Sequence, residues 1–288
     1  MTAASEPPRQ RSLRGLSTRG FHELVYYEWG PAKAERCVVC VHGLTRNGRD
    51  FDRLAAALAE AGCRVVCPDV VGRGRSDWLA DPAGYAYPQY LADANALIAR
   101  LDVEAVDWVG TSMGGLIGMF FAAQPKSPLR RLVINDVGPF IPKAALARIG
   151  TYLGQNNRFA NLAEADTHFR SVHAPFGPLS DADWALITEH SVQADGEGGC
   201  RLRHDPAIAT AFQKGPLEDV NIWPVWDAIA ASPLVLRGAE SDLLLAETAA
   251  EMTRRGAGAQ VVEIQGCGHA PALMDPAQIA IVRDFLLT

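Results

Sequence analysis

The chain has 288 residues and a formal net charge of -6, with 27 Lys and Arg against 33 Asp and Glu. Because nucleic acids and anionic membranes bind positively charged surfaces, this balance argues against both as partners. No apolar run approaches the ~20 residues that cross a bilayer, and a content of 48% hydrophobic and 21% charged residues is usual for a globular protein.

The first twenty residues are rich in Arg, Ser, Pro and Gly and lack the apolar core of a secretory signal. We therefore expect residues 1–20 to form a solvated, disordered tail, with an organelle transit peptide as the alternative, and the protein to be cytoplasmic. Cys37 and Cys40 stand three apart in a predicted strand. They point to opposite faces and are poorly placed to share a metal, so reduced core cysteines are expected.

Strand-like and helix-like segments then alternate along the chain, which is typical of a parallel sheet covered by helices. The apolar run over residues 36–41 is continuous, as expected for a strand buried on both faces. The remaining strands are predicted at residues 21–29, 63–70, 105–110, 129–136, 233–238 and 260–266, and the helices at 50–61, 89–101, 114–123, 246–255 and 275–287.

The regular alternation stops between Val137 and Asp227, where amphipathic helical pieces are joined by Gly and Pro without a clear strand. An insertion of that length is either functional or a subdomain of its own. The sequence therefore predicts an α/β core formed by residues 21–136 and 228–288, with a helical cap over residues 137–227 inserted into it.

The decisive motif is GTSMG at residues 110–114, at the junction of a predicted strand and a predicted helix. A nucleophilic serine on such a sharp turn stands clear of the sheet, and glycines two residues away on either side remove side chains that would collide there. The following helix directs its backbone N–H groups at the site where negative charge develops. Ser112 is therefore the candidate nucleophile.

A serine hydroxyl needs a base, and the base needs an acid to orient it. His269 follows a predicted strand and lies at the same edge of the sheet as Ser112, so it is the candidate base. Asp242 follows the preceding strand and completes the order Ser, Asp, His, which makes it the favoured acid. Asp136, at the end of an earlier strand, is the rival.

The tetrahedral intermediate needs two backbone donors for its oxyanion. Met113, next to the nucleophile, supplies one. Leu44 is the second, because Gly43 lets the loop after the first buried strand come close to the reaction centre. His42 is expected to brace this loop and is also a candidate for contact with substrate.

Five segments together resemble the α/β-hydrolase family from about residue 21 onward: VCVHGL, PDVVGRGRSD, GTSMGG, LRGAESD and GCGHAP. The D-x-x-G-x-G-x-S turn over residues 69–76 is structural in that family. The resemblance implies a mostly parallel sheet flanked by helices, a Ser-Asp-His triad, and an inserted cap that selects the substrate. It implies no metal or organic cofactor, and we expect a monomer or homodimer.

Serine at the turn argues against haloalkane dehalogenases and epoxide hydrolases, whose members carry Asp there. The resemblance implies cleavage of a small carboxylic ester through an acyl-enzyme, with short polyesters such as 3-hydroxybutyrate oligomers as one substrate class. A carbon–carbon bond hydrolase of ring-cleavage products, a lactonase and a small-molecule receptor with slow turnover are the alternatives. HGLTRNGRDF and HAPALM lack the longer Gly-rich stretch and the aromatic residue of the carbon–carbon hydrolases.

Two aromatic residues of the insertion are candidates for the pocket. Phe140 follows the strand that ends at Asp136 and is expected at the entrance, with a hinge or packing role as the alternative. Trp223 lies where the insertion rejoins the core and is a candidate wall of the acyl pocket, although its helical spacing also fits an interface core.

Overall fold

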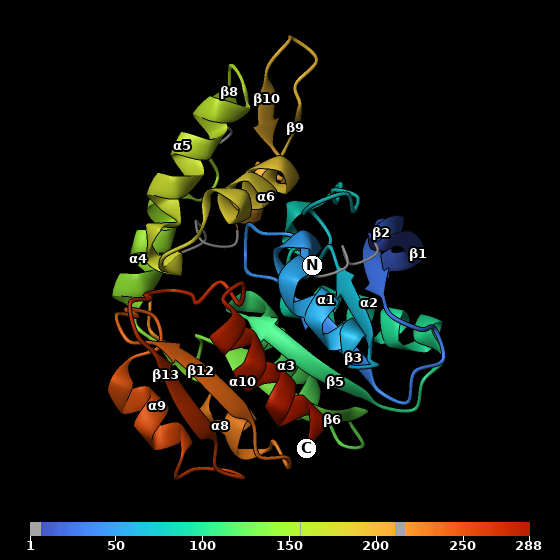
Figure 1. Cartoon of the computed structure of the whole chain (residues 1–288), viewed down its shortest axis with the longest axis vertical. Coiled ribbons are helices and arrows are strands. Elements are labelled where there is room, and N and C mark those ends of the chain that lie inside the picture. Colours follow the sequence, from blue (N-terminus) through green and yellow to red (C-terminus); the bar gives the residue numbers. More distant parts are fainter. Residues whose placement is uncertain (1–6, 156, 211–216) are drawn as a thin grey trace.

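The computed structural model describes residues 7–155, 157–210 and 217–288, and its centre is an eight-stranded sheet (Figure 1). The first two strand pairs are antiparallel and the others are parallel, as predicted for an α/β core. In spatial order the strands are β1 (Arg9–Ser17), β2 (Gly20–Trp29), β4 (Arg64–Pro68), β3 (Cys37–Val41), β5 (Val106–Thr111), β6 (Leu129–Asn135), β12 (Leu234–Gly238) and β13 (Gln260–Ile264).

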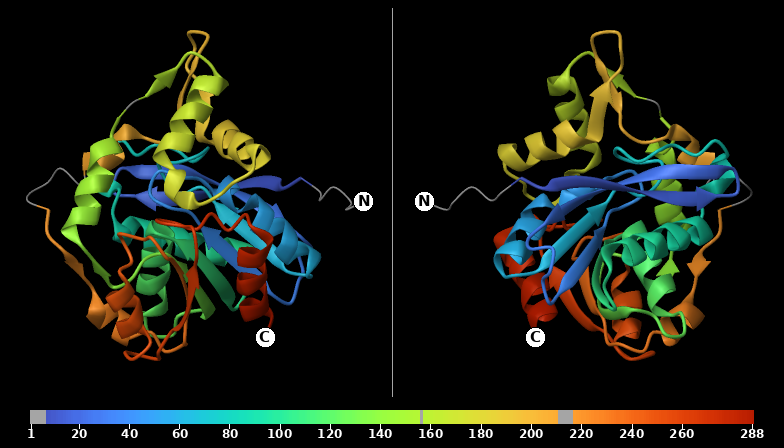
Figure 2. Two further views of the ribbon diagram at one scale, coloured as in Figure 1. Left: turned by 60° about the vertical axis from the view of Figure 1, so that its left-hand side comes forward. Right: turned by 90° about the vertical axis from the view of Figure 1, so that its right-hand side faces the viewer.

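Helices cover both faces of this sheet and bury a separate apolar cluster on each (Figure 2). One face carries α2 (Tyr87–Leu101), α3 (Met113–Ala122), α8 (Trp223–Asp227) and α9 (Ala246–Met252). The other face carries α1 (Asp52–Glu60) and α10 (Pro276–Leu287). Because β3 is buried on both faces, its five residues are all apolar.

The N-terminal segment differs from the predicted disordered tail. Arg9–Ser17 forms β1, which pairs along its whole length with β2 through a tight connection at Gly20. Most β1 side chains are exposed, so the strand lacks the apolar alternation that identifies a half-buried strand in a sequence. Its order comes from backbone pairing at the sheet edge, and residues 1–6 of the predicted tail lie outside the described residues.

Most of the described part of the inserted segment, residues 137–227, lies above the carboxyl edge of the parallel strands, whereas its last helix, α8, packs on one face of the sheet (Figures 1 and 2). It contains helices, as predicted, and a small apolar cluster of its own around Phe169 and Trp184. The expectation that it has no strand is wrong, since five short strands form two small sheets; residues 156 and 211–216 lie outside the described residues. Its elements before α8 are β7 (Phe140–Ile141), α4 (Lys143–Tyr152), β8 (Arg158–Phe159), α5 (Leu162–Val172), α6 (Asp181–Ser191), β9 (Val192–Ala194), β10 (Cys200–Leu202) and β11 (Val220–Asn221).

The described residues also contain four short 3-10 helices: η1 (Gly48–Phe51), η2 (Pro82–Gly84), η3 (Ala174–Phe176) and η4 (Pro206–Ala209). All six cysteines lie in the described part of the chain and are buried free thiols. In the same residues, no helix is both long enough and apolar enough to cross a membrane.

Candidate active site

Ser112 lies on a strained turn between β5 and α3. Its backbone has φ 52° and ψ -114°, a region that residues with side chains rarely adopt. Only glycine fits at the two flanking positions, because a side chain would collide with the backbone. A Cβ atom on Gly110 would lie 2.2 Å from the Gly114 carbonyl oxygen, and one on Gly114 would lie 2.0 Å from the Val41 carbonyl oxygen. The turn therefore holds the serine hydroxyl above the sheet, at the start of a helix.

His269 joins this serine to a carboxylate. Its Nε2 atom lies 2.9 Å from Ser112 Oγ, and its Nδ1 atom lies 2.8 Å from Asp136 Oδ2. The three side chains come from loops after β5, β6 and β13, which end at the same edge of the sheet. Their order in space is nucleophile, imidazole and acid, the geometry in which a histidine can take a proton from the hydroxyl.

Asp136 is fully buried and its carboxylate is held by two further donors. The Gly238 N–H donates to Oδ1 at 2.7 Å, and the Ser241 hydroxyl donates to Oδ2 at 2.6 Å. Hydrogen bonds of this kind stabilise the charged form of a buried carboxylate and restrict its orientation. The Asp136 carboxylate is thereby fixed toward His269.

The structure does not place Asp242 against His269, which corrects the favoured acid of the sequence analysis. Asp242 is about half exposed and forms a two-pronged pair with Arg148 of α4, with Oδ1 2.8 Å from the guanidinium. Both candidate loops end at the correct sheet edge, so chain order did not separate them. The direction of the side chains did, because Ser241 turns inward to Asp136 while Asp242 turns outward.

His42 braces the loop after β3 and does not enter the pocket above Ser112. Its Nδ1 lies 2.7 Å from the Gly43 carbonyl oxygen, and its Nε2 accepts the Val70 N–H at 2.9 Å. Burial lowers the pKa of His42 to about 3, so the ring stays neutral. Both ring nitrogens are engaged by backbone, which leaves neither for a substrate.

Arg73 is a residue of this site that the sequence analysis left in a structural turn. Its side chain is completely buried. Nε donates to the Leu44 carbonyl oxygen at 2.8 Å, and one terminal nitrogen donates to Tyr90 Oη at 3.0 Å. The other terminal nitrogen lies 3.5 Å from Met113 Sδ. Among the described residues, no carboxylate lies within 4 Å of this guanidinium.

A pocket of about 520 Å³ opens above Ser112 and is almost wholly apolar. Its core wall comes mainly from the loop before α2 and from α2 and α3; its opposite wall comes largely from the inserted segment. The lining residues are Leu44, Tyr85, Ala86, Tyr87, Pro88, Tyr90, Ser112, Met113, Leu116, Phe120, Val137, Ile141, Leu146, Ile149, Ile208, Leu217, Val220, Ile222 and Leu243. A volume of this size fits a small organic molecule.

The two aromatic residues expected in this pocket do not line it. Phe140 pairs with Asn221 in the small β7–β11 sheet. Trp223 packs on the core and lies under Arg255, whose guanidinium carbon is 4.4 Å from the ring centroid. Ile141 and Ile222, their direct neighbours, line the pocket instead. Successive side chains of an extended chain point in opposite directions, so an error of one residue changes which side chain faces the cavity. Sequence spacing does not define the position to within one residue.

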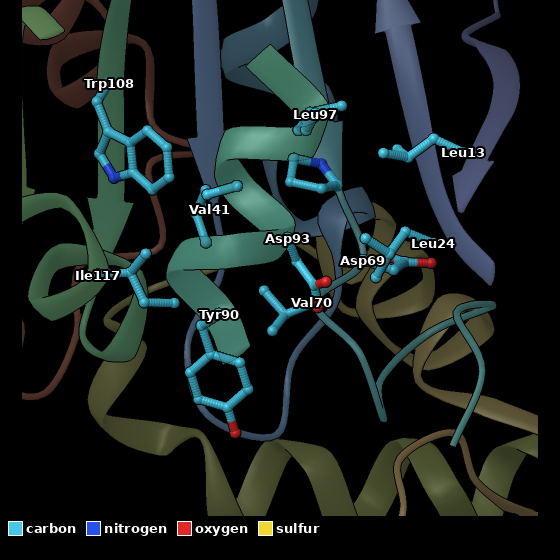
Figure 3. A pocket seen from close by; sticks show the side chains of 12 residues that line it. Leu13, Leu24, Val41, Asp69, Val70, Tyr90, Asp93, Leu97, Trp108 and Ile117 are labelled. Carbon is cyan, nitrogen blue, oxygen red and sulfur yellow. The ribbon is translucent and has the colours of Figure 1, made fainter. Parts of the chain in front are cut away.

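A second void, of about 30 Å³, lies between the sheet and α2 (Figure 3). It is lined by apolar and aromatic side chains, among them Leu13, Leu24, Tyr90 and Trp108, and by the side chain of Asp93. It holds about one water molecule at most, and Ser112, His269 and Asp136 do not line it, although Tyr90 also lines the pocket above Ser112. It is a packing defect and not a substrate site.

Comparison with known proteins agrees with this architecture. A family model described as the alpha/beta hydrolase fold matches residues 36–276. The chain is 48% identical to a 3-hydroxybutyrate-oligomer hydrolase from Cupriavidus necator, over 98% of both chains. It is 30% identical to lipase LipV from Mycobacterium tuberculosis, over 90% of this chain and 96% of that protein.

Two solved structures are similar over nearly their whole length. An alpha/beta hydrolase from Novosphingobium aromaticivorans superposes with a TM-score of 0.86 at 35% identity, covering 99% of both chains. A crystal structure of a protein from Rickettsia typhi superposes with a TM-score of 0.90 at 32% identity, covering 98% of this chain and 99% of that one. The fold predicted from the sequence is confirmed, and the chain belongs to the α/β-hydrolase family.

Proposed function

We propose that this protein is a serine hydrolase of carboxylic esters, with Ser112 as nucleophile, His269 as general base and Asp136 as the acid that orients it. The observation that carries the proposal is the continuous hydrogen-bonded chain from Ser112 Oγ through His269 to the Asp136 carboxylate, with contacts of 2.9 and 2.8 Å. Asp136 here replaces Asp242, the acid favoured in the sequence analysis.

The reaction proceeds in two halves. His269 Nε2 takes the Ser112 Oγ proton as the oxygen attacks the ester carbonyl, and the imidazolium is stabilised by Asp136. Collapse of the tetrahedral intermediate expels the alcohol, which takes the proton from His269, and leaves an acyl group on Ser112. Water then attacks the acyl carbon, with His269 taking its proton and returning it to Ser112, and the acid is released.

The oxyanion of each tetrahedral intermediate accepts hydrogen bonds from the backbone N–H groups of Leu44 and Met113. Within the described residues, neither N–H donates to another protein group, so both are available. Arg73 contacts the residues that carry these donors, through the Leu44 carbonyl oxygen and Met113 Sδ. It fixes the loop, and its buried positive charge favours the negative charge that develops nearby.

The substrate class follows from the pocket and from one relative. The pocket is apolar and of the size of a short acyl chain or oligomer. The relative from Cupriavidus necator, which matches 98% of this chain, is a 3-hydroxybutyrate-oligomer hydrolase. We therefore propose short hydroxyalkanoate oligomers as substrates, and residues 137–227 as the cap that closes over Ser112 and selects chain length.

The test is turnover of the 3-hydroxybutyrate dimer and trimer, beside a series of p-nitrophenyl esters and a vinylogous diketone acid. Wild-type protein is expected to release 3-hydroxybutyrate and to react with an organophosphonate probe at Ser112. The Ser112→Ala variant should keep its fold, lose the label and lose at least ~10³-fold in kcat. Wild-type-like turnover in that variant, or cleavage of the diketone acid alone, contradicts the proposal.

A further inference from the structure

A polar groove of about 440 Å³ lies on the outer side of the turn that carries Arg73. One wall is the core segment 74–78, and the other is formed by Gln193, Arg201 and Arg203 from the region of strands β9 and β10. Ser112 and His269 are not among its lining residues. The groove is therefore separate from the pocket in which ester hydrolysis is proposed.

Three guanidinium groups line this groove without a direct ion pair to any described carboxylate. Among the described residues, the side chains of Arg75, Arg201 and Arg203 make no ion pair within 4 Å and no hydrogen bond. Most other arginines pair with a carboxylate, as Arg158 does with Asp195. Three unpaired cations side by side are unusual in a chain whose net charge is -6.

Water does not fully solvate the guanidinium group of Arg203. Its Nε atom is buried and has no hydrogen-bond partner within the part of the chain that the structure describes. Burial lowers the pKa of Arg203 and the neighbouring charge of Arg75 lowers it further, although Asp69 and Glu189 act in the opposite direction. A buried donor without an acceptor and two repelling cations are both unfavourable, and an anion in the groove relieves both at once.

Among the described residues that line the groove, Asp77 is the only acidic one; it forms no ion pair with these arginines within 4 Å, and its carboxylate accepts the Glu23 N–H at 2.7 Å. The groove also has an aromatic wall. Trp78 is 38% exposed, and the Arg201 guanidinium carbon lies 5.4 Å from its ring centroid. A flat apolar surface beside clustered guanidinium groups suits an anion that also carries an organic part.

We infer that this groove binds an organic phosphate of about nucleoside-diphosphate size, independently of the proposed hydrolysis. A carboxylate offers one negative charge, whereas a phosphate group carries close to two and has three oxygens that accept bidentate contacts from arginine. The groove volume exceeds that of phosphate alone, which leaves room for the organic part against Trp78.

The groove joins the core to the inserted segment. The Gly74 N–H donates to the Arg203 carbonyl oxygen at 2.9 Å, and Arg73 forms an isolated bridge with His204. A phosphate held by Arg75 from the core and by Arg201 and Arg203 from the insertion therefore ties the two parts together. Binding is expected to raise the thermal unfolding temperature, since a ligand that binds only the folded state stabilises it.

The experiment is titration of the full chain with ADP and with inorganic pyrophosphate, followed by calorimetry and tryptophan fluorescence. Wild-type protein is expected to bind both, more weakly as salt rises. Arg201→Gln and Arg75→Gln should each weaken binding about tenfold or more, and Trp78→Phe should remove the fluorescence change. Arg255→Gln is the matched control, because Arg255 also stacks on a tryptophan but lies outside the groove.

Ser112→Ala should bind ADP like wild type, so failure of hydrolysis and failure of this site are distinguishable. Arg203→Gln should still fold in the absence of ligand, because the guanidinium makes no ion pair or side-chain hydrogen bond within the described residues, yet lose binding. The inference is overturned if neither ADP nor pyrophosphate binds at millimolar concentration, if 3-hydroxybutyrate binds as well as ADP, or if the arginine variants and the Arg255→Gln control bind alike.

Discussion

Ser241 and Asp136 stand 105 residues apart in the chain, yet the Ser241 hydroxyl donates a 2.6 Å hydrogen bond to the same carboxylate oxygen that contacts His269. Ser241 of the loop after β12 therefore points inward to Asp136, whereas the next residue, Asp242, points outward and pairs with Arg148. The loop after β12, which carries Asp242, thus supplies a supporting hydroxyl, and the carboxylate that contacts His269 comes from the loop after β6.

Substitution of each candidate acid in turn tests whether Asp136 or Asp242 orients His269. Asp136→Asn should lower kcat by several orders of magnitude, because the amide no longer holds His269 in the tautomer that accepts the Ser112 proton; a similar change in another enzyme costs ~10⁴-fold. Asp242→Asn is the matched control and should change kcat less than about threefold, since an exposed ion pair contributes little. A dead Asp242→Asn variant beside an active Asp136→Asn variant would contradict the proposed acid.

Removal of the buried guanidinium tests the oxyanion site. Arg73→Met keeps much of the side-chain volume and should lower kcat about 10- to 100-fold with a smaller change in KM, because the charge acts mainly on the intermediate. A trifluoromethyl ketone, which forms a tetrahedral adduct with the serine, should bind more weakly by a similar factor. If the variant binds this inhibitor normally and loses only thermal stability, Arg73 has a packing role alone.

The preference of the enzyme for short or long acyl chains tests which residues form the walls of the pocket. Leu146→Ala enlarges the apolar pocket and should shift relative kcat/KM toward longer acyl chains by about tenfold, within the ~1–3 kcal/mol that one methylene contributes. Trp223→Ala and Phe140→Ala are controls, because neither side chain lines the pocket. The measurement is kcat/KM for C2 to C10 p-nitrophenyl esters; an unchanged profile in Leu146→Ala, or the same shift in a control, is evidence against this wall.

Stability should fall on mild acidification. Burial lowers the pKa of His204 and of His190 to about 4 and that of His42 to about 3, against 6.5 for an unperturbed histidine. Between pH 6.5 and 4 each of these histidines therefore binds more protons in the unfolded chain than in the folded one, whereas Asp69, whose pKa burial raises to about 6, acts in the opposite direction. The contribution of these histidines to the free energy of unfolding is fully present above pH 6.5 and decreases as the pH falls, by up to ~1.4 kcal/mol per pH unit for each histidine.

The measurement is urea unfolding from pH 8 to pH 4.5, compared between wild type and His204→Asn. The variant cannot take up this proton when it unfolds, so its stability should decline less steeply below pH 6.5. Parallel curves for the two proteins would show that His204 does not contribute to the acid sensitivity.

Some features of this protein follow from the sequence alone because they depend on neighbouring residues. The alternation of apolar strands and helices is a local pattern, and it predicts the layered parallel core that the structure has. The turn at Ser112 depends on glycines two residues away, where any side chain would collide with backbone. His269 follows from its place after the last parallel strand, since such loops meet at one sheet edge.

Only the tertiary structure decided which side chains meet there. Spacing does not distinguish Asp136 from Asp242, because the choice depends on the direction in which each side chain leaves its loop. The edge strand β1 is held by backbone pairing and not by an apolar face, so no periodicity predicts it. The role of Arg73 was hidden for the same reason: its contacts with Leu44 and Met113 join residues 29 and 40 positions away, and burial of its charge is a property of the packed molecule.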